Sequence, residues 1–281
     1  MDHLFGGVEA GGTKFVCAIG KHTGETVAHQ EFPTTTPAET IANIIEFFRN
    51  NQPVSAIGIG SFGPVDLNPD SPTYGYITTT PKKDWRNIDM RGKIARALGV
   101  EVKISTDVIC SGIGEYHYGS AQGLNNFLYM TIGTGIGGAQ LLNGKPPQVT
   151  NHSEMGHIFV PHNMSVDPFP GVCPYHSDCL EGLASGLAME KRAGQRAEEV
   201  IDPIRWDLEV RYLAFGLASL VNTLRPQKII LGGGIVKHGG LIEEVSLMLQ
   251  ELINNYIPIP EISMSSDLNA VRGAISLAAS G

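Results

Sequence analysis

One short segment of this chain gathers side chains that bind soft metal ions. Cys173, His176 and Cys179 lie in the run Cys-Pro-Tyr-His-Ser-Asp-Cys, and thiolate sulfur and imidazole nitrogen are common zinc ligands. The chain has 4 cysteines in 281 residues, which is too few for a disulfide framework. The segment therefore predicts a metal site, whereas Cys17 and Cys110 have apolar neighbours and are interpreted as small core residues.

A glycine-rich turn near the start of the chain indicates a second kind of chemistry. Residues 4–20 have the pattern of a strand, a turn and a strand, and the turn contains Gly11-Gly12-Thr13-Lys14. Glycines let backbone N–H groups approach an anion, and the hydroxyl and ammonium add donors, so this turn can cradle a phosphate. It is not a Walker A loop, in which lysine precedes Ser or Thr and a helix follows. A turn without a ligand is the alternative, and it is the commoner meaning of such a hairpin.

A similar turn occurs in the second half of the chain. Residues 127–142 again predict strand, turn and strand, and the turn satisfies Gly-x-Gly-x-x-Gly from Gly133 to Gly138. That fingerprint binds a dinucleotide only where a helix follows, and here a strand is expected. Two glycine hairpins could instead hold a polyphosphate, with the hydroxyls of Thr13 and Thr134 as additional donors.

Two further positions follow buried strands. Asp107 comes directly after the strand expected at 100–106 and before a helical stretch, where it could act as a catalytic carboxylate or as a helix N-cap. On these residues alone, capping is the favoured interpretation. Gly232-Gly-Gly leads from a strand towards the helix expected at 241–254, and such a turn either accepts a nucleotide or allows tight packing.

The hydrophobic pattern alternates between strand and helix along the chain. No low-complexity linker separates the two halves, which indicates structured connections between them. The remaining elements expected from periodicity and from Gly and Pro positions are helices at 37–50, 89–98, 109–118, 205–224 and 267–279 and strands at 56–60 and 228–231.

Composition restricts the classes of partner. The net charge of −8, with a sequence pI near 5.6, argues against a surface for nucleic acid. No apolar run has the length of a membrane span, and the N-terminus lacks the pattern of a signal peptide. We therefore expect a cytoplasmic protein with no nucleic-acid or membrane partner.

Several motifs together, in order, resemble those of one protein family. They are Glu9-Ala-Gly-Gly-Thr-Lys14, Gly60-Ser-Phe-Gly-Pro64, Thr106-Asp-Val, Gly133-Thr-Gly-Ile-Gly-Gly138, Glu154-Met-Gly-His157, the cysteine segment and Gly232-Gly-Gly234. In order and spacing this set resembles the ROK family of sugar kinases over nearly the whole chain. The segment Cys-Pro-Tyr-His-x-x-Cys is most similar to that of the bacterial fructokinases, as are Thr-Thr-Thr-Pro-Lys and Thr-Asp-Val.

The resemblance implies an α/β protein with the actin-like, hexokinase-like ATPase fold, in which two α/β lobes enclose an active-site cleft. The implied lobes are residues 1–110 with about 266–281, and residues 111–265 carrying the metal loop. The implied reaction is phosphorylation of a hexose by Mg-ATP, with fructose giving fructose 6-phosphate as the first expectation and mannose or glucose as alternatives. A homodimer is also implied.

The resemblance also implies roles for individual residues. Asp107 matches the catalytic base, which reverses the preference for capping. Glu9 is expected near the magnesium ion. The phosphates and adenosine are expected at Gly11, Gly12, Thr13, Lys14, Gly133, Thr134, Gly135, Gly137, Gly138, Gly233 and Gly234, and the sugar at Gly63, Pro64, Asp107, Glu154 and Glu181.

With His157, the three ligands of the cysteine segment make a set of four nitrogen and sulfur donors. A closed set of this kind is typical of structural zinc, so the metal is expected to fix Glu154 and Glu181 and to take no part in phosphoryl transfer. One residue departs from the family pattern: Ile109 stands where the family has an asparagine that contributes to the sugar site.

Two other function classes are alternatives to a kinase. A sugar-responsive repressor would need a helix-turn-helix segment before the first hairpin, which begins by residue 5 and leaves no room for one. A non-catalytic sugar-binding zinc protein remains an alternative because of Ile109.

Overall fold

The structure is a computed structural model that describes residues 3–147, 151–266 and 269–280. The chain forms two compact units. Unit 1 consists of Met1–Leu124, Leu141–His152 and Ser266–Gly281, and unit 2 consists of Asn125–Gln140 and Ser153–Ser265. The C-terminal segment therefore belongs to the same unit as the N-terminal strands.

Unit 1 is built on a sheet with the strand order β3-β2-β1-β4-β7. The expected hairpin at 4–20 is confirmed as the antiparallel pair β1 (Phe5–Ala10) and β2 (Lys14–Gly20). Strands β4 (Ala56–Ser61) and β7 (Glu101–Thr106) extend the sheet in parallel with β1. The edge strand β3 (Thr26–Pro33) was not expected, because most of its side chains are polar or exposed.

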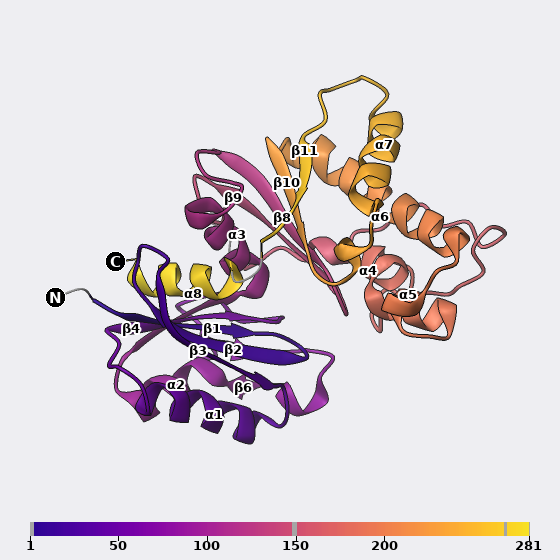
Figure 1. Cartoon of the computed structure of the whole chain (residues 1–281). Helices are drawn as coiled ribbons and strands as arrows, with labels where there is room; N and C mark the ends of the chain where they lie inside the picture. The colour runs from indigo at the N-terminus through magenta and orange to yellow at the C-terminus, as the bar shows by residue number, and fades with distance from the viewer. Residues whose placement is uncertain (1–2, 148–150, 267–268, 281) are drawn as a thin grey trace. The chain divides into compact units, whose positions relative to one another are not determined.

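Helices cover both faces of this sheet (Figure 1). On one side lie α1 (Pro37–Arg49) and α2 (Met90–Leu98), and on the other lie α3 (Asp107–Tyr118) and α8 (Asn269–Ala279). Helix α1 begins as its sequence predicts, because Thr36 accepts a hydrogen bond from the backbone N–H of Glu39 and proline occupies the first turn. The expected helix at 267–279 is confirmed from Asn269 onwards, and Asp267 lies outside the described residues.

The two helices α3 and α8 approach each other closely through glycine. A methyl group on Gly114 would lie 1.9 Å from the carbonyl oxygen of Asn269, and one on Gly273 would lie 1.7 Å from that of Cys110. Their contact also contains Glu115, which is 1% exposed and accepts a hydrogen bond from the side chain of Asn269. Unit 1 is thus completed by a helix that comes last in the sequence.

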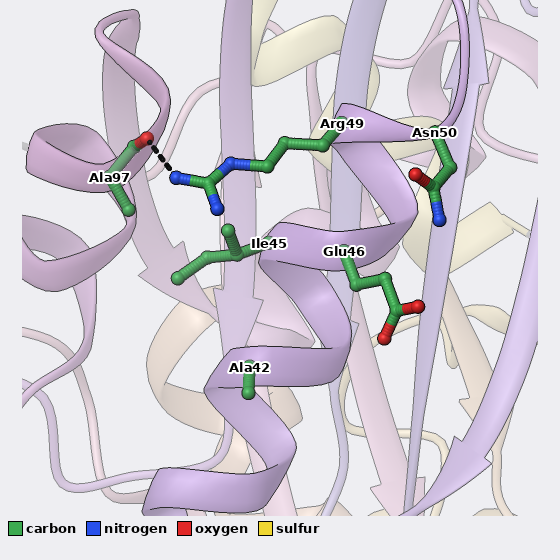
Figure 2. A pocket seen from close by; sticks show the side chains of 6 residues that line it. All are labelled: Ala42, Ile45, Glu46, Arg49, Asn50 and Ala97. Carbon is green, nitrogen blue, oxygen red and sulfur yellow. Dashed lines mark hydrogen bonds between the residues drawn. The ribbon is translucent and has the colours of Figure 1, made fainter.

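A groove of about 310 Å³ lies between α1 and α2 of unit 1 (Figure 2). One Nη of Arg49 crosses the groove and donates to the carbonyl oxygen of Ala97, at 3.0 Å. The other lining residues are Ala42, Ile45, Glu46 and Asn50. None of the side chains expected to bind sugar, nucleotide or metal lines this groove.

Unit 2 has its own sheet, with the strand order β11-β10-β8-β9. Its strands are β8 (Asn126–Ile132), β9 (Ile136–Leu142), β10 (Lys228–Gly232) and β11 (Glu261–Met264), and β8, β10 and β11 run parallel. The helices are α4 (Leu180–Ala184), α5 (Gly186–Ala193), α6 (Pro203–Leu224) and α7 (Leu241–Ile253), and α6 packs against α7 and α4. Among the described residues, no helix is long and apolar enough to cross a membrane.

The connection after β10 differs in detail from the expectation. The glycine turn was expected to lead directly to the helix at 241–254, but a short 3-10 helix (Ile235–Lys237) comes first. Helix α7 then begins after Gly240, which adopts a left-handed conformation with φ 88°. The glycine turn is therefore not the N-terminus of α7, and no macrodipole of that helix acts on it directly.

Candidate functional site

The carboxyl ends of three parallel strands bring expected site residues of unit 1 to one edge of its sheet. In the strand register Glu9 lies beside Gly60, and Ser61 lies between Ala10 and Thr106. Directly after these strand ends come the first glycine turn after β1, the loop after β4, and Asp107 after β7. Loops at the carboxyl ends of parallel strands are the usual ligand-binding edge of an α/β sheet.

Asp107 is the first residue of α3 and not its N-cap. The cap is Thr106, whose hydroxyl oxygen accepts from the backbone N–H of Ile109 at 3.3 Å. A carboxylate oxygen of Asp107 accepts from the N–H of Val108 at 2.8 Å. The interpretation of Asp107 as a cap is therefore wrong, and its carboxylate stands at the electropositive start of a helix. Ile109 is 5% exposed, so its side chain is part of the core.

The first glycine turn (Gly11–Lys14) is closed by its own backbone and braced by Thr34, the residue after β3. The N–H of Gly11 donates to the carbonyl of Lys14 at 2.9 Å. Thr34 donates its N–H to the carbonyl of Thr13 and its hydroxyl to that of Gly11. Three hydrogen bonds therefore support the backbone of the turn.

Charged side chains flank this turn. The ammonium of Lys14 pairs with the carboxylate of Glu31 at 2.7 Å, and both side chains are more than half exposed. Burial raises the pKa of Glu9 above its ordinary value, the charge of Lys14 opposes that rise, and Glu31 adds to it. A cation close to Glu9 would stabilise the ionised carboxylate and so oppose the effect of burial, which suits an expected position beside magnesium.

The loop after β4 carries Gly63 and Pro64, which are joined by a cis peptide bond. It is held from two sides. The N–H of Val65 donates to Nε2 of His152 at 3.2 Å, and the carbonyl of Pro64 accepts from the N–H of Thr78 at 2.8 Å. Two of the expected sugar residues of unit 1, Gly63 and Pro64, thus lie on a braced loop.

In unit 2 the four expected metal ligands come together. The ligand atoms of His157, Cys173, His176 and Cys179 all lie within 4.8 Å of one another. Nδ1 of His157 is 3.6 Å from Sγ of Cys173 and 3.5 Å from Sγ of Cys179. Zinc bonds of about 2.3 Å to sulfur and 2.0–2.1 Å to nitrogen give tetrahedral edges of about 3.6 Å between S and N. The donor set therefore fits tetrahedral zinc.

His157 faces the two glutamates expected to bind sugar as well as the sulfur atoms. Its Nε2 is 4.0 Å from a carboxylate oxygen of Glu154 and 4.0 Å from one of Glu181. The other oxygen of Glu181 accepts from the backbone N–H of Ile136 at 2.9 Å. Glu181 thereby connects the metal cluster with the second glycine turn (Gly133–Gly138).

The second glycine turn is packed closely on its surroundings. The N–H of Gly133 donates to the carbonyl of Gly135, and the carbonyl of Gly133 accepts from Gly186 at 2.6 Å. A methyl group on Gly135 would lie 2.5 Å from the carboxylate of Glu181. Thr134 is exposed at the tip, where its hydroxyl can meet a ligand.

The turn after β10 contains glycines of two kinds. Gly233 has φ 97°, and a methyl group on it would lie 2.2 Å from the carbonyl oxygen of Ile132, so the backbone itself requires glycine. A methyl group on Gly234 would meet no atom within 4 Å. Gly234 therefore borders open space that a ligand can approach.

Sequence reasoning missed a buried ion pair that anchors the metal loop. Arg192 on α5 donates to Asp167 at 3.2 Å, and both side chains are 4% exposed. The hydroxyl of Tyr212 on α6 donates to the same carboxylate oxygen at 2.9 Å, and the carbonyl of Asp167 lies 3.0 Å from His162. No local pattern links these positions, because they come from a loop and two helices that are far apart in sequence. His152, which holds Val65, was missed for the same reason.

The expected site residues thus form two groups, one in each unit. Unit 1 holds Glu9, the first glycine turn, Gly63, Pro64 and Asp107. Unit 2 holds the second glycine turn, Gly233, Gly234, Glu154, Glu181 and the metal ligands.

The chain is similar in sequence and in fold to proteins that are already known. The chain is 44% identical to a fructokinase of Lactococcus lactis subsp. cremoris, over 92% of this chain and 89% of that protein. It is 40% identical to a fructokinase of Streptococcus mutans, over 93% and 90%. A solved ROK family glucokinase from Streptomyces griseus, in complex with glucose and AMPPNP, has the same fold, with a TM-score of 0.80 and 23% identity over 99% of this chain and 100% of that one. A sequence model of the ROK family matches residues 5–280, and the chain belongs to this family.

Proposed function

We propose that this protein is an ATP-dependent hexose kinase whose substrate is D-fructose and whose product is fructose 6-phosphate. The observation that carries the proposal is the high identity, over nine-tenths of the chain, to proteins named fructokinase. Support from geometry comes from the carboxyl edge of the unit 1 sheet, which gathers Glu9, a braced loop and a carboxylate at a helix start.

Asp107 is the proposed base. Its carboxylate accepts the proton of the sugar hydroxyl as that oxygen attacks the terminal phosphorus of ATP, and ADP leaves with the electron pair of the broken P–O bond. Phosphoryl transfer of this kind depends on positioning and on charge stabilisation around the transferring group. Gly63 and Pro64 are the proposed neighbours of the sugar in unit 1.

The nucleotide is proposed to bind through backbone and side-chain donors of both glycine turns. Glu9 would hold magnesium through its bound waters, and the ion supplies positive charge to the phosphates. Gly233 and Gly234 lie beside the adenosine in this proposal. The phosphate groups are assigned to Gly11, Gly12, Thr13, Lys14, Gly133, Thr134, Gly135, Gly137 and Gly138.

Zinc is the proposed resident metal of the four-donor cluster, bound by His157, Cys173, His176 and Cys179. A closed set of four protein ligands leaves no position for substrate, so its role is structural. His157 would bind zinc through Nδ1 and present Nε2 to Glu154 and Glu181, whose carboxylates hold sugar hydroxyls. In this proposal the metal positions the two glutamates of the sugar site and takes no part in phosphoryl transfer.

Two larger-scale assignments complete the proposal. Residues 1–110 with about 266–281, and residues 111–265, are proposed as the two functional lobes. The active protein is proposed to be a homodimer, for which sedimentation should give about twice the chain mass of 30.1 kDa. A mass of one chain at assay concentration would reject the dimer.

The test of the function is a coupled assay of ADP formation with fructose, mannose and glucose. Fructose should give the highest kcat/KM, and the product should carry its phosphate on O6. Mannose and glucose belong in the panel because Ile109 replaces an asparagine of the family's sugar site. Absence of hexose-dependent ADP formation would reject the kinase, and a preference for another hexose would reject fructose alone.

A further inference from the structure

A second lysine lies against the first glycine turn. A methyl group on Gly12 would lie 3.4 Å from Cε of Lys82, the carbon that carries the ammonium, and would meet no other heavy atom within 4 Å outside its chain neighbours. Lys82 is exposed. Its charged end therefore has access both to the turn and to whatever binds there.

The backbone of Lys82 is attached to the hairpin that it overlies. Its carbonyl accepts from the N–H of Trp85 at 2.9 Å, and Trp85 is 2% exposed. The indole stacks on Phe15, the residue after the turn, with ring centroids 5.5 Å apart, and donates to the carbonyl of Thr35 at 3.1 Å. A buried aromatic anchor thus fixes the position from which the flexible lysine side chain extends.

The same segment is also attached to the loop proposed to bind sugar. Thr78, which precedes Lys82, donates its N–H to the carbonyl of Pro64 at 2.8 Å. Residues 78–85 therefore run from the proposed sugar loop to the proposed phosphate turn. Lys82 thus lies at the turn, on a segment that also contacts the loop proposed to bind sugar.

Lys14, the lysine within the turn, is differently engaged. Its ammonium pairs with Glu31 at 2.7 Å, and its charge also acts on Glu9. Two carboxylates thus share the positive charge of Lys14. Beside the magnesium proposed at Glu9, a further cation at the turn would offset the charge of Glu31 towards a bound polyphosphate.

We propose that Lys82 is a further catalytic residue, whose ammonium binds the terminal phosphoryl group of ATP at the first glycine turn. This role rests on the proposed kinase function. Lys82 stays protonated throughout, neither forming nor breaking a covalent bond, and Asp107 receives the proton of the attacking hydroxyl. Its contribution is positive charge that follows the phosphoryl oxygens during transfer.

The test compares Lys82→Met with Lys83→Met, which removes the same charge from the neighbouring exposed residue. Steady-state assays with fructose measure kcat/KM for ATP, and calorimetry measures binding of AMPPNP and of AMP. Lys82→Met should lower kcat/KM for ATP about 100-fold, the usual size of effect when one aligned donor is lost. It should weaken AMPPNP and leave AMP unchanged, because AMP lacks the terminal phosphates. Lys82→Arg should recover part of the rate, and Lys83→Met should stay within about twofold of wild type.

Two results would overturn the role of Lys82. One is an equal kcat/KM for Lys82→Met and Lys83→Met, provided that the wild-type protein phosphorylates sugar. The other is an equal loss of AMP and AMPPNP binding in Lys82→Met, which would make Lys82 a structural support. An inactive wild type would instead reject the kinase function, so the two failures are distinguishable.

Discussion

At the scale of single residues, the carboxylate of Asp107 is not needed as a helix cap, because its neighbour Thr106 has that role. Threonine and aspartate both cap helices, and in Thr106-Asp107 either could serve. The structure assigns the cap to Thr106, whose hydroxyl accepts from Ile109. Asp107 then lies one position inside the helix, with its carboxylate at the electropositive helix start and not used as the cap.

Asp107→Asn should remove most of the activity while leaving substrate binding largely intact. The amide cannot accept the hydroxyl proton at neutral pH, and positioned general bases contribute about 10²- to 10⁴-fold to rate. The measurement is kcat for ADP formation at saturating ATP and hexose. Asp70→Asn, at an exposed position, is the matched control. An unchanged kcat in Asp107→Asn would refute the proposed mechanism.

Glu181 has two functions that two substitutions can separate. One carboxylate oxygen accepts from the N–H of Ile136, and the other lies 4.0 Å from Nε2 of His157. Glu181→Gln keeps an acceptor for Ile136, whereas Glu181→Ala leaves that N–H without it.

Glu181→Ala should lower the free energy of unfolding by about 1–3 kcal/mol, the cost of leaving a buried donor unpaired. Glu181→Gln should be less destabilised, yet both variants should show a raised KM for hexose. Urea unfolding and steady-state kinetics measure the two effects, with Glu190→Ala, an exposed glutamate, as the control. Equal stability of the two Glu181 variants would contradict the assigned hydrogen bond.

At the scale of elements, the described residues between β9 and α4 have little regular structure of their own and are held at two places. One is the four-donor cluster, and the other is the buried pair of Asp167 and Arg192. Burial raises the pKa of the Cys179 thiol to about 12, with the neighbouring Cys173 adding to the rise. Zinc would have to replace this proton, since only the thiolate is a strong ligand.

Removing zinc should therefore loosen one end of the loop and leave the other anchored. We expect the melting temperature to fall by roughly 10 °C, corresponding to a loss of about 4 kcal/mol in a chain of this size. The KM for hexose should rise more than the KM for ATP, and added zinc should restore both. Elemental analysis and scanning calorimetry measure this. Freshly purified protein without zinc, or full activity after proven metal loss, would contradict the structural role.

Elements differed in how well the sequence predicted them. Helices α1 and α6 and the two glycine hairpins were predicted because periodicity, caps and turn residues agree locally. Strands β3 and β11 and the short helices α4 and α5 were not, because they are polar, short or exposed on one side. Their conformations depend on partners that no local pattern reveals.

The site was predictable in part for a similar reason. The ordered motifs identified the chemical groups, and the close approach of the four metal donors follows that prediction. The contacts that hold those groups, such as His152 to Val65 or Trp85 to Phe15, join residues far apart in the chain. Such pairings arise from the register of the sheet and the packing of helices, and so required the structure.

At the scale of the whole molecule, unit 1 depends on the end of the chain. Helix α8 packs on β1, β4 and α3, and its Gly273 lies against the backbone of Cys110. Because α3 begins at Asp107, the position of the proposed base depends on this helix contact.

Gly273→Val should therefore lower both stability and activity. The side chain would collide with backbone that cannot move alone, and overpacking of this kind costs about 3 kcal/mol. We expect a lower urea midpoint and a reduced kcat. Gly239→Ala, where a methyl group meets nothing within 4 Å, should change stability by no more than about 0.5 kcal/mol. A urea midpoint of Gly273→Val equal to that of the wild type would show that α3 and α8 can move apart without a loss of stability.

The placement of α8 also has a consequence for biosynthesis. Chains emerge from the ribosome N-terminus first, and domains usually fold in that order. Here the strands of unit 1 are made early, but the helix that covers β1 and β4 is translated only after all of unit 2. Unit 2 can thus fold during translation, whereas the apolar face beneath α8 stays uncovered until the residues that follow unit 2 have been translated. We expect nascent chains stalled before Asn269 to bind chaperones through unit 1.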